Sequence, residues 1–220
     1  MSSGPKQQYS GKPLFDDHEV PVTIGTVFEE SARDEGFSFV AGVDEVGRGC
    51  LAGPVVAGAV ILDISKPLPE GLNDSKKISK KKLPSIAKAV RERAIAYSIG
   101  QIDAQVIDRI NILEATKRAM LSAIDGLKPA ADMLLIDALQ LKESTLPQKP
   151  IIKGDSVSVS IAAASIVAKV YRDDLMKVYD QRFPQYGFAK HVGYGTKAHF
   201  EALREVGPCE LHRVSFRGVG

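Results

Sequence analysis

Three apolar, strand-like runs of this chain each lead directly into acidic residues, and this repeated pattern constrains the fold more than any other feature. Residues 37–43 run into Asp44 and Glu45, residues 133–136 into Asp137, and residues 150–152 into a turn that contains Asp155. An acid after a strand is often only a turn residue, so Asp137 or Asp155 alone would carry little weight. Open α/β sheets, however, place their sites where strands end. If these strands are neighbours, the four carboxylates meet at one edge of a sheet.

Four carboxylates held close together repel one another, and divalent cations remove that penalty. A ligand set made of oxygen atoms, without cysteine or histidine, favours Mg²⁺ or Mn²⁺ over Zn²⁺. Two such ions can activate a water molecule and stabilise the leaving oxygen of a phosphodiester. His191, His199 and His212 have no consistent metal-ligand spacing and are left out of this site.

A Gly47-Arg48-Gly49 turn follows the first acid pair. Glycines allow close backbone approach, and a guanidinium suits phosphate, so the turn favours phosphoryl chemistry. The glycine spacing is one residue too long for a dinucleotide-binding loop, and a strand rather than a helix follows. No phosphate loop of the nucleotide-hydrolase type occurs.

Strand and helix signals alternate along the body of the chain, which predicts a mixed sheet covered by helices. Residues 37–43 and 55–62 are expected to form an antiparallel pair. The other expected strands are residues 98–102, 133–136 and 150–152, and the expected helices are residues 27–35, 79–97, 104–127, 161–183 and 196–206. A Ser-rich segment precedes the helix at 161–183 and can cap it.

The chain has 220 residues and a net charge of +2, so we expect one domain whose basic surface is local. Residues 51–62 form the longest apolar stretch, which is too short and too broken by Gly and Pro to span a bilayer. Two distant cysteines, Cys50 and Cys209, are expected to be free thiols. With no apolar leader at the N-terminus, these features predict a cytoplasmic protein without membrane contact.

An ordered series of motifs resembles the bacterial ribonuclease HII family. The resemblance covers residues 37–216, with the motifs in the family's order. They are residues 44–49 followed by 51–55, then 72–77, 135–137, 153–156, 161–169 and 193–196. It implies an α/β, ribonuclease H-like mixed five-stranded sheet flanked by helices, with a small C-terminal helical extension. We expect residues 1–36 to be a partly flexible N-terminal extension and residues 37–220 to be the catalytic domain.

The resemblance also implies an activity. The enzyme would be an endoribonuclease that hydrolyses the RNA strand of RNA–DNA hybrids and nicks 5′ to ribonucleotides embedded in duplex DNA. This would place it in DNA replication and ribonucleotide excision repair, as a monomer. Asp44, Glu45, Asp137 and Asp155 match the family's metal-binding, catalytic carboxylates. They would hold two Mg²⁺ or Mn²⁺ ions and leave 5′-phosphate and 3′-hydroxyl ends.

Substrate contacts carry over in the same way. The Gly47, Arg48 and Gly49 turn would read the ribose 2′-hydroxyl, the group that distinguishes RNA from DNA. Tyr194 would stack on the deoxyribose that follows the ribonucleotide. On its residue type alone, Tyr194 would be taken for a packed surface aromatic. Further contacts to the nucleic acid are expected from Asn73, Ser75, Lys76, Lys77, Ser165 and Lys169.

Two positions depart from the family pattern: Val192 and Val214 stand where basic residues are expected. The sister ribonuclease HIII fits less well, because residues 1–36 are too few for its substrate-binding domain and Asp155 stands where it would carry Glu. The alternative function is a catalytically silent module that binds RNA–DNA hybrids on the same fold. Four carboxylates facing a polyanion argue against that alternative.

Overall fold

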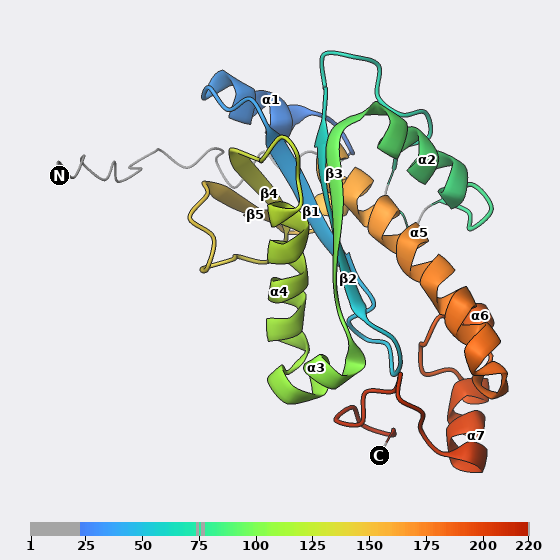
Figure 1. Ribbon diagram of the computed structural model, residues 1–220. Coiled ribbons are helices and arrows are strands. Elements are labelled where there is room, and N and C mark those ends of the chain that lie inside the picture. The colour runs from blue at the N-terminus through green and yellow to red at the C-terminus, as the bar shows by residue number, and fades with distance from the viewer. Residues whose placement is uncertain (1–22, 74, 76–77, 220) are drawn as a thin grey trace, which may run out of the picture.

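A single five-stranded sheet lies at the centre of the computed structural model, which describes residues 23–73, 75 and 78–219 (Figure 1). The strands occur in the spatial order β3-β2-β1-β4-β5. β1 pairs antiparallel with β2 and parallel with β4, and β4 pairs parallel with β5. This confirms the mixed sheet and its antiparallel pair. The strands are β1 (Val40–Val46), β2 (Val55–Leu62), β3 (Ala94–Ile102), β4 (Met133–Asp137) and β5 (Gln148–Ile151).

Helices cover both faces of the sheet. α4 packs on β2 and β3, whereas α5 packs on the opposite face of β1 and β2 and also contacts α2 (Figure 1). In the described ranges, no helix is long and apolar enough to cross a membrane. The helices are α1 (Val27–Asp34), α2 (Leu83–Arg93), α3 (Ala104–Ile110), α4 (Ile112–Asp125), α5 (Val159–Arg182), α6 (Phe188–His191) and α7 (Lys197–Val206), with short 3₁₀ turns η1 (Gly154–Ser156) and η2 (Pro184–Tyr186).

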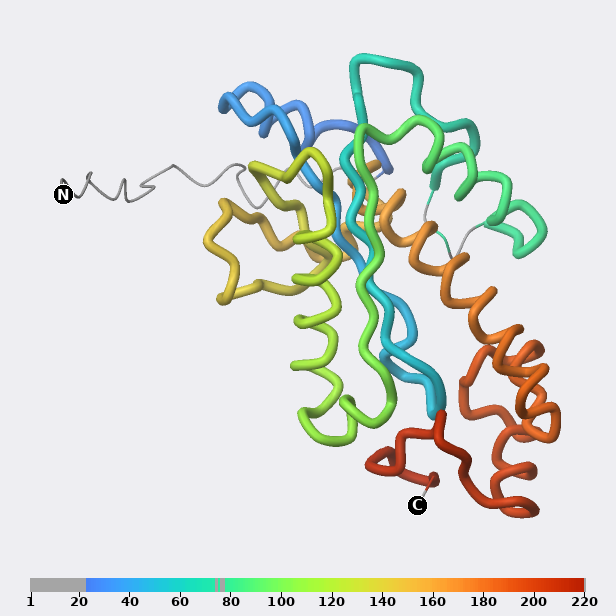
Figure 2. Tube along the Cα trace, in the orientation of Figure 1, coloured from blue at the N-terminus to red at the C-terminus, as the bar shows by residue number. Residues whose placement is uncertain are grey.

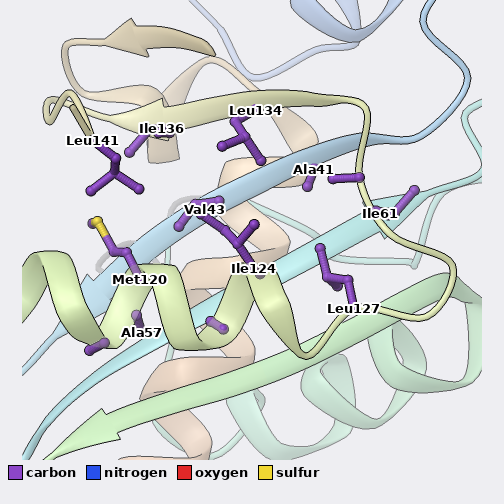
Figure 3. Packing of buried hydrophobic residues seen from close by; sticks show 14 of the residues in the cluster. Ala41, Val43, Ala57, Ile61, Met120, Ile124, Leu127, Leu134, Ile136 and Leu141 are labelled. Atoms are coloured by element: carbon purple, nitrogen blue, oxygen red, sulfur yellow. The ribbon is translucent and has the colours of Figure 1, made fainter. Parts of the chain in front are cut away.

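Alternation along β1 decides which side chains enter which core, because successive residues of a strand point to opposite faces. Ala41 and Val43 face α4 and pack with Met120 and Ile124 (Figure 3). Val40 belongs to the cluster on the other face, which includes Ile161 of α5. Asp44 therefore lies on the α5 face.

The long helix α5 approaches the sheet through glycines. A Cβ at Gly42 would lie 2.0 Å from the carbonyl carbon of Ser160, and one at Gly58 would lie 2.5 Å from the carbonyl oxygen of Ala164. Gly58 pairs with Asp44 in the sheet, so this close packing sits beside the first acid of the pair. The Ser-rich cap is confirmed, because the Ser158 hydroxyl accepts a hydrogen bond from the Ile161 N–H at 3.2 Å.

Three predicted boundaries are wrong. The first strand begins at Val40 and runs to Val46, so the acid pair lies inside it. The helix expected over 79–97 ends at Arg93, because residues 94–102 pair with β2 along their length and this pairing outweighs helix propensity. The helix expected over 104–127 breaks at Asn111, which has φ 72° and caps α4 through its side chain.

The C-terminal elements pack on the loop between β1 and β2, which spans residues 47–54. Leu51 and Ala52 of that loop join a cluster with Phe188 of α6 and Leu203 of α7. Figure 2 shows the C-terminal segment running beside the turn that joins β1 to β2. The C-terminal extension is thus attached to the end of the sheet where β1 ends.

A chain of buried imidazoles links this extension to Tyr194. The Cys209 N–H donates to His212 Nδ1 at 3.0 Å, so the other ring nitrogen of a neutral His212 carries the proton. His212 Nε2 then donates to His199 Nε2 at 3.0 Å, and His199 Nδ1 donates to the Tyr194 carbonyl at 2.9 Å. The first two bonds require neutral rings, because each of them uses a ring nitrogen as the acceptor. Burial, followed by the charge of His199, lowers the pKa of His212 from 6.5 to about 4.

Replacing Gly42 with Ala should destabilise the fold, because the new methyl group would collide with the α5 backbone. Overpacking of this kind costs about 1–3 kcal/mol. Urea unfolding would measure the loss. Gly25→Ala is the matched control, since its Cβ would meet nothing within 4 Å. Equal unfolding midpoints for the two variants would contradict the packing described here.

Low pH should reduce the free energy of unfolding, because it protonates His212. Its folded pKa lies below its unfolded value of 6.5, so the unfolded chain binds the extra proton between pH 6.5 and about 4. Stability is complete above pH 6.5 and falls as the pH drops towards 4, by about 1.4 kcal/mol per pH unit for one proton. His212→Gln should flatten this part of the stability curve. A variant with the same slope as the wild type would refute the assignment.

Candidate active site

A groove of about 340 Å³ opens where β1 and β4 end. It contains residues from both strands, from the turn after β1, from the loop before α2 and from α5. The residues that line it are Asp44, Glu45, Val46, Gly47, Arg48, Gly49, Ser75, Asp137, Ser165, Lys169 and Tyr194. Elements far apart in sequence therefore contribute to one site.

Asp44 is the most deeply buried acid of the groove, at 5% exposure. One of its oxygens accepts the Glu45 N–H at 2.7 Å, and its carboxylate also bonds to the Ser165 side chain. Burial raises the pKa of Asp44 well above its usual range, and the nearby charges of Glu45 and Asp137 raise it further. The ionised form of Asp44 thus lacks sufficient positive charge around it.

The Glu45 carboxylate also lacks sufficient positive charge around it. Its Oε1 accepts a hydrogen bond from Arg48 at 3.1 Å. Its Oε2 is buried and has no hydrogen-bond partner among the described residues. Burial raises the pKa of Glu45 even though Arg48 lowers it. An unpartnered buried carboxylate oxygen is costly, and a cation bound to it would remove that cost.

Asp137 and Asp155 are brought together by the turn after β5. The Gly154 N–H donates to Asp137 Oδ1 at 2.7 Å, which places the following residue, Asp155, near the end of β4. Asp155 lies in η1 and is 3% exposed. In the part of the chain that the structure describes, it is not among the residues that line the groove.

The α5 face beside the groove is polar. Ser165 Oγ lies 3.1 Å from Ser75 Oγ, so the loop before α2 is tied to the helix. Lys169, one turn after Ser165, donates to Asp173 at 2.7 Å. The lysine cation at this wall is therefore paired with a carboxylate of its own helix.

Tyr194 also lines the groove and is 43% exposed. Its hydroxyl bonds to the thiol of the buried Cys50, and burial is the main cause that raises the pKa of Tyr194. Its aromatic ring is thus held beside the turn formed by Gly47, Arg48 and Gly49.

The donor set suits a hard divalent cation. Asp44, Glu45 and Asp137 present only oxygen atoms, and the unpartnered Oε2 of Glu45 together with the crowded charges calls for positive charge. Over the described ranges, no group of three or more Asp, Glu, His or Cys side chains is already arranged to hold an ion.

Most of the predicted residues meet in this groove. Asp155 and Asn73 are outside its lining, and Lys76 and Lys77 fall outside the described residues. Sequence reasoning missed Cys50, Arg172 and Arg213, which lie beneath the turn. The signal available was weak: Arg172 falls seven residues after Ser165, on the same face of α5, but arginine rarely enters a core.

Comparison with known proteins agrees with this architecture. The family model for ribonuclease HII matches residues 41–219. Ribonuclease HII of Chlamydia caviae is 55% identical over 209 residues, which cover 94% of this chain and 98% of the relative.

Solved structures share the fold at lower identity. Ribonuclease H2 of Pyrococcus horikoshii OT3 aligns with a TM-score of 0.72 and 23% identity, over 83% of this chain and 95% of that one. Bst ribonuclease HIII in complex with Mn²⁺ aligns with a TM-score of 0.63 and 24% identity, over 86% of this chain and 70% of that one. The ribonuclease H-like fold is thereby confirmed. The ribonuclease HII family model matches residues 41–219, and the Chlamydia caviae enzyme is 55% identical over 94% of the chain. The chain therefore belongs to the ribonuclease HII family.

Proposed function

We propose that the groove is the active site and that Asp44, Glu45, Asp137 and Asp155 hold two divalent cations, Mg²⁺ or Mn²⁺. The protein is a ribonuclease H, an endoribonuclease that acts on RNA–DNA hybrids. We propose further that it nicks 5′ to single ribonucleotides in duplex DNA. The observation that carries this proposal is the buried, mutually repelling acid group beside a glycine turn in one groove.

Metal dependence fits both this chain and a structural neighbour. The Bst ribonuclease HIII was solved with Mn²⁺, and the carboxylates of this chain offer oxygen ligands of the kind that suit this ion. When bound, two divalent ions supply an activated water and stabilisation of the departing 3′-oxygen. The products would carry 5′-phosphate and 3′-hydroxyl ends.

The chain's own residues would position the substrate. Gly47 and Gly49 let the backbone approach the sugar, so that N–H groups of the turn can bond to the 2′-hydroxyl. Ser75, Ser165 and Lys169 stand where phosphates of the same strand would pass. Asn73, Lys76 and Lys77 extend this path in our proposal.

Val192 and Val214, which replace expected basic residues, act through their backbones in this structure. The Val192 carbonyl accepts from Arg172 at 2.8 Å, and the Val214 N–H donates to Asp108 at 2.9 Å. Neither valine supplies a positive charge, so phosphate contacts near the C-terminal end would come from other residues.

A catalytically silent hybrid-binding module is not favoured. Asp44, Glu45 and Asp137 all line the groove, and the Chlamydia caviae relative is named as a ribonuclease. We propose residues 37–220 as the catalytic domain, with α1 of the 1–36 extension packed on it through Phe28 and Ala32. We also propose that the enzyme acts as a monomer in the cytoplasm, where its two free cysteines would stay reduced.

Asp44→Asn should abolish nicking of duplex DNA that contains one ribonucleotide. Loss of one ligand should slow the reaction by at least about 100-fold in Mg²⁺ or Mn²⁺. Gel analysis of a labelled strand would measure the nick. An unchanged rate in the variant, or no nick by the wild type, would contradict the proposal.

A stability control separates loss of chemistry from loss of fold. Asp44→Asn removes a buried, repelled charge, so the variant should be at least as thermally stable as the wild type without metal. Mg²⁺ should raise the melting temperature of the wild type more than that of the variant, because only the wild type has the full ligand set.

Tyr194→Ala should weaken nicking at an RNA-to-DNA junction. Stacking of a base on an aromatic ring is worth about 1–3 kcal/mol; for a sugar on the ring we expect the low end of this range, a decrease of about tenfold. Tyr97→Ala is the matched control, because Tyr97 is 45% exposed on β3 and does not line the described groove. Initial rates on junction and all-RNA hybrid substrates would be compared. Equal effects of the two variants would refute the role of Tyr194.

A further inference from the structure

Two fully buried arginines lie beneath the turn of the candidate site. Arg172 comes from α5 and Arg213 from the C-terminal segment, and both are 0% exposed. Burying a guanidinium is costly unless each of its donors is satisfied. Here the donors are used on backbone carbonyl groups, and six of the seven bonds go to the loop over residues 47–54.

Arg213 donates hydrogen bonds to carbonyl groups at both the start and the end of the loop over residues 47–54. It donates to the carbonyl groups of Gly47 and Arg48, each at 2.8 Å, and through two nitrogens to that of Gly53 at 3.1 and 2.9 Å. Its guanidinium lies over the Phe216 ring, 5.0 Å from the centroid. The planar fork of arginine allows these bonds to be made at once, which a lysine cannot reproduce.

Arg172 joins the same loop to the segment that carries Tyr194. It donates to the carbonyl groups of Pro54 at 2.9 Å, Ala52 at 3.0 Å and Val192 at 2.8 Å. Three glycines with positive φ surround its guanidinium: a Cβ at Gly47, Gly53 or Gly193 would lie 2.2 to 3.4 Å from its atoms. A larger residue at Gly47 would displace it, because the Cβ would lie 2.2 Å from Arg172 Nε.

The carbonyl bonds to Arg213 also determine where the N–H groups of Arg48 and Gly49 point. In a trans peptide the C=O and the following N–H point in opposite directions. With the Gly47 and Arg48 carbonyls aimed at Arg213, the N–H groups of Arg48 and Gly49 point away from it. Among the described residues, neither N–H donates to a protein acceptor, and both residues line the groove. A cation on the carbonyl side also strengthens the N–H as a donor.

We propose that Arg172 and Arg213 are positioning residues that set ribose specificity. Arg213 aims and polarises the Arg48 and Gly49 N–H groups towards the sugar, and Arg172 sets the spacing between this turn and Tyr194. The inference rests on the proposed function of the turn as the reader of the 2′-hydroxyl. It goes beyond that function by assigning the discrimination to two side chains that touch no substrate.

The test is the preference for ribose in binding, measured apart from cutting. Fluorescence anisotropy, with Ca²⁺ in place of Mg²⁺, gives the affinity for a duplex with one ribonucleotide and for the same duplex in all-deoxy form. Arg213→Lys and Arg172→Lys should lower the affinity ratio about three- to tenfold, the value of one or two misaligned hydrogen bonds. Arg118→Lys, on an exposed position of α4, is the control and should keep the ratio.

A second readout distinguishes positioning from simple support of the fold. The amide proton shifts of Arg48 and Gly49 should move in Arg213→Lys, whereas amides at the centre of α4 should not. A purely structural role would lower the melting temperature and leave both the ratio and these shifts unchanged in the folded variant, which would overturn the proposal. If neither lysine variant folds, Phe216→Leu decides on the same two readouts, since it removes the ring under the Arg213 guanidinium and keeps an apolar side chain for the surrounding clusters.

Failure of the proposed function would look different. Asp44→Asn should lose cutting and retain the ribose preference in binding. The arginine variants should have a lower ribose preference and retain divalent-ion binding, which is measured as the Mg²⁺-induced rise in melting temperature. A wild type that binds both duplexes equally would overturn the inference. A wild type that prefers ribose but never nicks would overturn only the assigned chemistry.

Discussion

The arrangement of the site depends on how closely α5 lies against the two central strands. Gly42 and Gly58 leave room for the helix backbone itself, so α5 passes beside the end of β1 without intervening side chains. This contact brings Ser165 within reach of Asp44 and puts Arg172 under the adjoining turn. One helix thereby supports both the acidic group and the loop over residues 47–54.

The buried acids and the buried arginines next to the turn at residues 47–49 differ in how well their charges are compensated. Above it, Asp44 and Glu45 are buried with too little compensation, which raises their pKa values and leaves one oxygen of Glu45 unpartnered. Below it, Arg172 and Arg213 are buried but have carbonyl partners for their donors. The first arrangement suits the binding of a cation, and the second suits a rigid scaffold.

Much of the architecture could be predicted because its signals are local. Apolar runs located β1, β2 and β4, and a serine cap preceded α5. The errors arose where distant pairing or a single backbone conformation decided the outcome. Residues 94–97 follow β2 rather than their helical pattern, and Asn111 adopts a positive φ that splits one expected helix into two. Neither event leaves a strong local mark in the sequence.

By itself, the sequence determined the chemistry that is available: acids at strand ends, a glycine turn, and an ordered set of motifs shared with the ribonuclease HII family. Tertiary structure decided which groups meet. It gathered Asp44, Glu45 and Asp137 in the lining of one groove, and among the described residues this lining does not include Asp155. It also buried Arg172 and Arg213 against the carbonyl groups of the loop over residues 47–54. The reason is physical: burial and hydrogen-bond partners are properties of packing between distant segments, and no local pattern encodes them.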